Sequence, residues 1–359
     1  MTPLNNPQKL CMTDLQKLVR PNILKLSTGF HAESETDGQP CRIALDANEN
    51  PYNKPFNRYP SDCQHELKAQ LAKLKRVADN EIFLGNGSTE AIDLCYRIFC
   101  QPRIDNVVAI DPTCRLYRQF AAVNDIEYRP VPLSDDFQLD ASQLLKACNG
   151  HTKLVWLCSP NTPSGNTLDT EEVEKVLRTF HGMVIIDETY SDFSRRNPFR
   201  IRLAEFPNLI VLNTFSKAWG GAAVRLGMAF AQNAVIDLFN KVKPPYNISR
   251  MAQECAIDLL RHRYDIEDWT KIILLERQRV MKAFESLNCC EKVYPSSANF
   301  FLARMKNARN VYGYLAEKGI CVYDCSQETL CEDCLRITIG SKAENSEILG
   351  LLRFYSPAE

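Results

Sequence analysis

Four groups of polar residues in this 359-residue chain follow, or lie inside, short apolar runs, and each could do chemistry on a small anionic molecule. They are Lys217, Asp187, the turn Gly-Asn-Gly-Ser-Thr-Glu at residues 85–90, and Arg336. A lysine amine can form an imine with a carbonyl compound when it is partly neutral, which partial burial or a cationic neighbour promotes. The alternative for Lys217 is an ordinary solvated lysine, because most lysines lie exposed on the surface.

Asp187 ends an apolar run, and a buried carboxylate there needs a partner. A protonated pyridine nitrogen would be such a partner. Tyr190, three residues later, could hydrogen-bond a phenolic oxygen on the same ring. The alternative is an ordinary aspartate that caps the segment after a strand.

Two further groups could bind anions. The turn at residues 85–90 lies between a predicted strand and a predicted helix, so its glycines and the helix N-terminus suit a phosphate group. Its hydroxyls, with two residues that flank the lysine, would complete the cup: Ser88, Thr89, Ser216 and Arg225. A tight turn without a ligand is the alternative. Arg336 lies inside an apolar run and needs an anion, either a substrate carboxylate or an internal Asp or Glu.

An imine-forming lysine, a carboxylate, a phosphate cup and an anion clamp are together what a pyridoxal 5′-phosphate site requires. The sequence therefore predicts that cofactor and no metal ion. Lys217, Asp187 and Tyr190 are the predicted catalytic residues.

Alternating apolar runs and amphipathic stretches predict the elements that would position these residues. Strands are expected at residues 82–84, 107–110, 154–158, 183–186 and 209–212, and helices at 62–78, 88–100, 114–124 and 170–180. This alternation is typical of an α/β fold with a mostly parallel sheet flanked by helices. Ligands bind at the carboxyl ends of the strands in such sheets.

The pattern of predicted helices and strands changes after residue 243. Residues 249–287 are strongly helical, and short strands are expected at 300–303, 321–323 and 335–339. We therefore expect a large cofactor-binding domain over residues 49–245 and a small α+β domain over residues 246–359. The N-terminal segment, residues 1–48, is expected to pack with the small domain.

The composition excludes several classes of protein. Hydrophobic residues make up 45% and charged residues 24%, and the formal net charge is −1, which indicates an ordinary globular protein without a nucleic-acid footprint. No apolar stretch approaches the length of a membrane span. The 15 cysteines are an odd number, so complete intrachain pairing is impossible, and a reducing cytoplasm is the expected location.

Four cysteines form the tightest group: Cys321, Cys325, Cys331 and Cys334. Thiols so closely spaced could bind zinc. However, Cys334 leads into the apolar run at residues 335–339, so packing in the core is the favoured interpretation.

Over nearly its whole length the chain resembles the fold-type-I (class I/II) pyridoxal-phosphate aminotransferases, and among them the histidinol-phosphate aminotransferases. The resemblance rests on residues 45–52 (LDANENPY), 58–60 (RYP), 85–90 (GNGSTE), 159–165 (SPNTPSG), 187–190 (DETY), 216–218 (SKA), 298–300 (ANF) and 335–340 (LRITIG).

This resemblance implies a homodimer in which Tyr59 reaches the cofactor phosphate of the neighbouring subunit. It implies that Arg336 grips the carboxylate of the amino donor and that Asn50 is a further substrate contact. Lys217 would also move the proton between substrate and cofactor. The implied reaction transfers an amino group from glutamate to imidazole acetol phosphate in histidine biosynthesis.

Four positions depart from the pattern of the family. Thr162 replaces an asparagine that hydrogen-bonds the phenolic oxygen of the cofactor, and Cys114 replaces an aromatic residue that stacks on the cofactor, although Tyr117 is nearby. Tyr323 replaces an arginine that binds the phosphate of the substrate. Residues 25–29 (KLSTG) stand where a Lys-Pro-Tyr segment lines the substrate site.

These departures concern the substrate more than the cofactor. Loss of a charged contact to a phosphate should cost about 1.5–3 kcal/mol, which Arg115 or Lys25 could offset. Three interpretations stay open. The chain is an aminotransferase for histidinol phosphate or for an aromatic substrate, a related decarboxylase of amino-acid phosphates, or a homologue that binds the cofactor with weak or no turnover.

Overall fold

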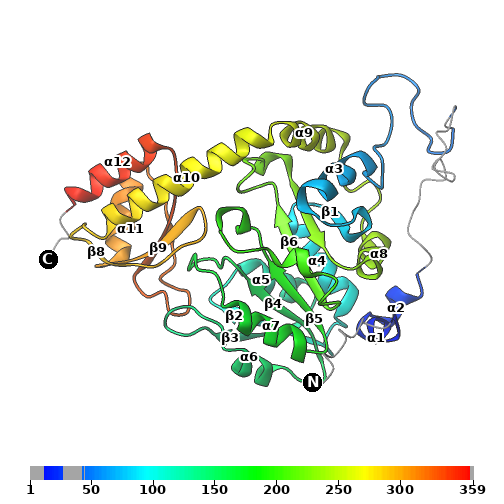
Figure 1. Cartoon of the computed structure of the whole chain (residues 1–359), viewed down its shortest axis with the longest axis horizontal. Coiled ribbons are helices and arrows are strands. Elements are labelled where there is room, and N and C mark those ends of the chain that lie inside the picture. Colours follow the sequence, from blue (N-terminus) through cyan, green and yellow to red (C-terminus); the bar gives the residue numbers. More distant parts are fainter. Residues whose placement is uncertain (1–11, 27–42, 44, 356–359) are drawn as a thin grey trace, which may run out of the picture.

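The computed structural model describes residues 12–26, 43 and 45–355 (Figure 1). Within these residues a seven-stranded sheet has the order β1-β7-β6-β5-β4-β2-β3. Strand β7 runs antiparallel to its neighbours β1 and β6, and the other pairs are parallel, which confirms the predicted α/β fold. Its strands are β1 (Ile82–Asn86), β2 (Asn106–Asp111), β3 (Glu127–Pro132), β4 (Thr152–Cys158), β5 (Met183–Asp187), β6 (Leu209–Thr214) and β7 (Leu226–Phe230).

A second, antiparallel sheet of the described chain has the order β10-β11-β9-β8. Its strands are β8 (Cys290–Val293), β9 (Phe300–Met305), β10 (Tyr323–Asp324) and β11 (Cys334–Thr338). The helices are α1 (Met12–Leu18), α2 (Pro21–Leu24), α3 (His65–Lys75), α4 (Ser88–Phe99), α5 (Arg115–Val123), α6 (Ala141–Ala147), α7 (Thr170–Thr179), α8 (Asn233–Val242), α9 (Arg250–Arg261), α10 (Arg263–Phe284), α11 (Ala308–Glu317) and α12 (Lys342–Arg353).

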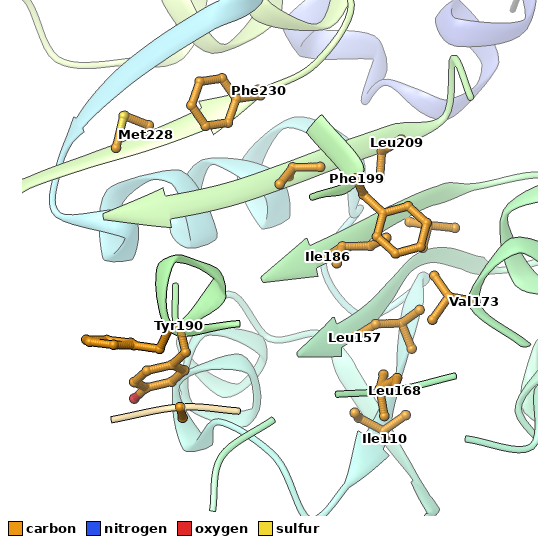
Figure 2. Packing of buried hydrophobic residues seen from close by; sticks show 14 of the residues in the cluster. Ile110, Leu157, Leu168, Val173, Ile186, Tyr190, Phe199, Leu209, Met228 and Phe230 are labelled. Atoms are coloured by element: carbon orange, nitrogen blue, oxygen red, sulfur yellow. The ribbon is translucent and has the colours of Figure 1, made fainter. Parts of the chain in front are cut away.

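The central strands are apolar throughout because both faces of the larger sheet are covered. In β4, Val155 and Leu157 pack into one core cluster, and Leu154 and Trp156 pack into the cluster on the opposite face. Figure 2 shows part of the first cluster, in which Leu157 lies close to Val173 of α7. The apolar runs give way to polar residues at the carboxyl ends of the strands. One example is Asp187, which pairs in register with Cys158 of β4.

Helix α10 connects the two sheets (Figure 1). Ile266, near its start, packs into the core of the larger sheet, as Ile257 of α9 does. Val280 and Phe284, near its end, pack beside the smaller sheet. The predicted domain boundary between residues 245 and 246 falls in the loop between α8, which ends at Val242, and α9, which begins at Arg250. By packing, however, α9 and the start of α10 belong with the larger sheet.

The described part of the N-terminal segment lies elsewhere than predicted. Leu15, Val19 and Ile23 pack with α4 and β2 in the core of the larger sheet, and the backbone N–H of Arg20 donates to the carbonyl of Ile98 at 2.9 Å. Figure 1 places α1 and α2 at the far side of the molecule from β8 and α12. For these residues the expected packing with the small domain is therefore wrong, because the apolar face of α1–α2 meets an apolar face of α4.

Candidate active site

A cavity of about 360 Å³ lies at the carboxyl ends of the central strands. It collects side chains that are far apart in the sequence, including residues from both sheets. Of the predicted site residues it is lined by Ser88, Thr89, Cys114, Thr162, Asp187, Tyr190, Ser216, Lys217, Arg225, Tyr323 and Arg336.

Lys217 follows β6 in a short turn that points its side chain into the cavity. The turn is held by a hydrogen bond of 3.0 Å from the N–H of Gly220 to the carbonyl of Lys217. The amine lies 5.4 Å from the centre of the Tyr190 ring. Partial burial, followed by the guanidinium of Arg336, lowers the pKa of Lys217, against the opposing effect of Asp187. A lowered pKa makes the neutral, imine-forming amine more accessible.

Asp187 ends β5 and is almost fully buried. Its Oδ2 accepts a hydrogen bond of 2.7 Å from the hydroxyl of Tyr117, and its Oδ1 accepts one of 3.0 Å from the N–H of Thr189. Tyr117 stacks on Trp156 with 4.6 Å between ring centres, and burial raises the pKa of its hydroxyl, so the hydroxyl stays a donor. Tyr117 therefore supports the carboxylate. It is absent from the residues that line the cavity, so it does not replace the missing stacking ring.

The predicted phosphate cup forms around the N-terminus of α4. Gly87 caps this helix with φ +74°, and a Cβ at that position would lie 2.5 Å from Nη2 of Arg225. At Gly227 a Cβ would lie 2.0 Å from the backbone nitrogen of Ser88. Glycine at both positions therefore lets Arg225 and β7 approach the helix end, where backbone N–H groups and the helix dipole favour an anion.

Arg336 lies in β11, directly opposite Tyr323 of β10. Its guanidinium lies 4.3 Å from the centre of the Tyr323 ring and 5.3 Å from that of Phe300. Its Nη1 donates to Oγ1 of Thr162 at 2.7 Å. Among the described residues no carboxylate forms an ion pair with Arg336, so the internal salt bridge considered from the sequence is not found there, and the fork faces the cavity.

The side chains of Thr162 and Cys114 line the cavity, Thr162 as a hydrogen-bonding hydroxyl and Cys114 as a thiol. The Thr162 hydroxyl accepts from Arg336 and still has its own proton to donate, as a hydroxyl can do both. Burial raises the pKa of Cys114 to about 12, so the residue remains a neutral thiol against the cofactor space.

Two predicted residues do not line this cavity. Tyr59 is 57% exposed, and its ring stacks on Tyr246 with 4.5 Å between centres. Asn50 is exposed, and its Oδ1 accepts from the backbone N–H of Tyr52 at 2.9 Å. Within one chain neither residue joins Lys217. Of the departing segment at residues 25–29, positions 27–29 lie outside the described residues.

The cysteine group packs as apolar side chains. Cys325, Cys331 and Cys334 are fully buried in a core cluster to which both sheets contribute, whereas Cys321 is exposed. Across the described residues, no group of three or more His, Cys, Asp or Glu side chains is arranged to hold a metal ion.

Sequence reasoning missed some residues of the site. It did not assign Thr189 or Thr214, and it did not connect Arg115 with Glu328, although both of these line the cavity. Thr189 could have been assigned to the site because its hydroxyl follows Asp187 by two residues in the run Asp-Glu-Thr at 187–189. No local pattern linked residues 115 and 328, which are 213 positions apart.

Comparison with known proteins identifies the class to which this fold and cavity belong. Residues 21–352 match the family described as aminotransferase class I and II, so the chain belongs to that family, whose enzymes depend on pyridoxal 5′-phosphate. Within the described residues no helix is long and apolar enough to cross a membrane.

Individual relatives carry a more specific name. The chain is 50% identical over 344 residues to histidinol-phosphate aminotransferase from Bacteroides fragilis, which covers 96% of this chain and 100% of that protein. The histidinol-phosphate aminotransferase structure from Clostridium acetobutylicum superposes with a TM-score of 0.77 at 23% identity, over 84% of this chain and 91% of that one. The enzyme from Sinorhizobium meliloti, solved with pyridoxal-5′-phosphate, gives 0.75 at 23% identity over 93% and 96%.

The residues of the cavity fit this cofactor. The cup offers a guanidinium, hydroxyls and a helix N-terminus to a phosphate, and its glycines leave the space that a Cβ would fill. The buried carboxylate of Asp187 suits a protonated ring nitrogen, and the amine of Lys217 shares the same cavity.

Proposed function

We propose that this protein is a pyridoxal-phosphate-dependent transaminase that acts on histidinol phosphate and 2-oxoglutarate in histidine biosynthesis, in the cytoplasm. The observation that carries the proposal is the meeting of Lys217, Asp187 and Arg336 in one cavity with the phosphate cup. The relatives named histidinol-phosphate aminotransferase support the choice of substrate.

Each residue has a role in this proposal. The phosphate of the cofactor would be held by Ser88, Thr89, Ser216 and Arg225. Asp187, fixed by Tyr117, would hold the ring nitrogen of the cofactor in the protonated form. Tyr190 and Thr162 would donate to its phenolic oxygen, and Cys114 would pack against its ring. Arg336 would bind the substrate anion and Tyr323 would contact the substrate, whereas Asn50, the other predicted substrate contact, lies outside the cavity of its own chain.

The cofactor supplies an electron sink when it is bound. Lys217 would carry out the proton transfer: its neutral Nζ would accept the proton from the substrate carbon, hold it as an ammonium group and then release it. The lowered pKa of Lys217 favours this role because a general base works best when its pKa lies near the working pH.

We further propose a homodimer in which Tyr59 contributes to the neighbouring active site. Tyr59 is exposed and stands outside its own cavity, beside Tyr246. An exposed aromatic ring in a groove that also includes Phe56 and Met251 is suited to a protein contact.

The test is incubation of the purified holoprotein with glutamate and, separately, with histidinol phosphate. A transaminase releases 2-oxoglutarate from glutamate and loses its visible absorption with either donor, and Lys217→Ala abolishes both signals. Release of carbon dioxide from an amino-acid phosphate would support the decarboxylase instead. Visible absorption without a response to any donor would indicate a homologue that only binds the cofactor. A strong preference for aromatic amino acids would overturn histidinol phosphate as substrate.

A further inference from the structure

One ion pair in the cavity has no part in the function proposed above. Nε of Arg115 donates to Oε1 of Glu328 at 2.6 Å, which joins the first residue of α5 to the loop between β10 and β11. The Arg115 guanidinium lies 5.2 Å from the centre of the Tyr323 ring, and the Arg336 guanidinium lies 4.3 Å from the same centre. A second cation therefore stands close to Arg336, beside the tyrosine that brings no charge.

The two side chains of this ion pair differ in how exposed and how restrained they are. The Glu328 side chain is only 15% exposed, whereas that of Arg115 is 62% exposed. The backbone of Glu328 is fixed, because its N–H donates to the carbonyl of Cys325 at 2.8 Å and its carbonyl accepts from Cys331 at 3.1 Å. The next residue, Thr329, donates its hydroxyl to the carboxylate of Asp111 in the larger sheet. Arg115 is therefore the partner that can move.

Arg115 also has unused hydrogen-bonding capacity. Only its Nε takes part in a hydrogen bond with another described residue. Its two terminal nitrogens remain available for a bidentate contact, the geometry that arginine offers to carboxylates and phosphates.

One cation of the cavity has no role in the proposed function. Of the cationic side chains that line the cavity within the described part of the chain, the proposed function uses Lys217, Arg225 and Arg336, which leaves Arg115. Among the carboxylates of the same described lining, Asp187 serves the ring nitrogen and Glu328 forms an ion pair with Arg115.

We propose that Arg115 binds the distal anion of the substrate, meaning an anionic group other than a carboxylate on the reacting carbon, and so determines specificity for substrates that carry one. This inference rests on the proposed function. Arg115 supplies the charge that Tyr323 lacks, and Glu328 holds Arg115 at the cavity until the anion takes its place. This distal anion is the phosphate of histidinol phosphate, which has no carboxylate, or the distal carboxylate of glutamate, and either group offers two oxygens to a guanidinium.

The experiment compares single-turnover half-reactions of the wild-type holoenzyme and of Arg115→Gln. Histidinol phosphate is paired with histidinol, which lacks the phosphate, and glutamate is paired with alanine, which lacks the distal carboxylate. For the donor whose distal anion Arg115 binds, Arg115→Gln should raise the half-saturating concentration by about 10- to 100-fold, with the truncated donor changed less than threefold. Arg115→Lys should restore part of the loss, because it restores the charge without the fork.

The half-reactions show whether Arg115 binds the phosphate of histidinol phosphate or the distal carboxylate of glutamate. A loss confined to histidinol phosphate assigns Arg115 to phosphate, and a loss confined to glutamate assigns it to the carboxylate. Losses with both donors assign it to both. Equal losses for a full donor and its truncated partner, or no loss with either full donor, would overturn the inference. If the wild-type enzyme shows no half-reaction with histidinol phosphate, the proposed substrate is wrong. The comparison of the glutamate and alanine half-reactions then still decides the role of Arg115.

Two further variants sharpen the comparison. Glu328→Gln frees Arg115 from its counter-ion and should lower the half-saturating concentration of the donor whose distal anion Arg115 binds by about two- to fivefold. Arg118→Gln is the matched control. Arg118 lies on the same helix and contacts the ring of Tyr128, outside the cavity, so its removal should leave all four half-reactions unchanged.

Discussion

The hydroxyl of Tyr117 donates a 2.7 Å hydrogen bond to Oδ2 of Asp187, across 70 positions of the sequence. This bond fixes the direction of the carboxylate. The ring that carries the hydroxyl is itself held by stacking on Trp156. The strength of the proposed contact to the cofactor nitrogen therefore depends on a residue behind the cavity.

Tyr117→Phe should weaken cofactor binding. A hydrogen bond to a charged group contributes about 1.5–3 kcal/mol, so the dissociation constant should rise by about 10- to 100-fold. Equilibrium titration of the apoprotein with cofactor, followed by visible absorption, measures this change. Tyr96→Phe is the control, because Tyr96 lies in the same aromatic cluster but donates to the carbonyl of Tyr117. Similar losses in both variants would contradict a specific role for the Asp187 contact.

The rate of imine formation should depend on pH through Lys217. Its amine reacts only when neutral, so the rate rises as the pH passes upward through the pKa of Lys217. Because that pKa is lowered, the rise should occur below the value of about 10.4 for an ordinary lysine. Arg336→Gln removes a cation that lowers the pKa, so the profile should move to higher pH.

Stopped-flow mixing of apoprotein and cofactor at a series of pH values measures this profile. Arg336→Lys keeps the positive charge and should leave the profile near that of the wild type. A profile for Arg336→Gln that stays in place or moves to lower pH would show that Arg336 does not set the pKa of Lys217.

Gly87→Ala should damage the phosphate cup. The backbone at Gly87 has φ +74°, a conformation that costs an alanine about 1–3 kcal/mol. The new Cβ would also displace Arg225, since it would lie 2.5 Å from Nη2. Cofactor affinity should therefore fall by about tenfold or more. The matched variant is Gly313→Ala, where an added Cβ meets nothing within 4 Å and affinity should be unchanged.

Subunit mixing tests the proposed role of Tyr59. Tyr59→Ala and Lys217→Ala homodimers should each have low activity. In a heterodimer, the chain with an intact Lys217 receives an intact Tyr59 from its neighbour, so one complete site forms. Activity should therefore recover when the two variants are refolded together, as measured by 2-oxoglutarate release. Heterodimers that form but stay inactive would place Tyr59 in its own site or in none.

Much of this architecture could be predicted because its signals are local. The runs that became β4, β5 and β6 are continuously apolar, and each is followed by residues that the sheet brings to one edge. Strand β3 was missed because it is an edge strand whose residues are mostly exposed or half-exposed, so no apolar run marks it.

The relationships that were missed depend on packing between distant segments. The ion pair of Arg115 with Glu328 and the hydrogen bond of Tyr117 with Asp187 leave no trace in either local sequence. The position of α1 and α2 was predicted wrongly for a similar reason. An amphipathic helix reveals which of its faces is apolar but not which surface will cover that face.

Two buried thiols near the cavity also provide a natural reporter. Cys325 and Cys331 are buried in the segment between β10 and β11, whereas Cys255 and Cys321 are exposed. An alkylating reagent should label Cys255 and Cys321 at once, and Cys325 and Cys331 only when that segment opens. That segment carries Glu328, so the labelling rate read by mass spectrometry would time the opening of the substrate side without any introduced probe.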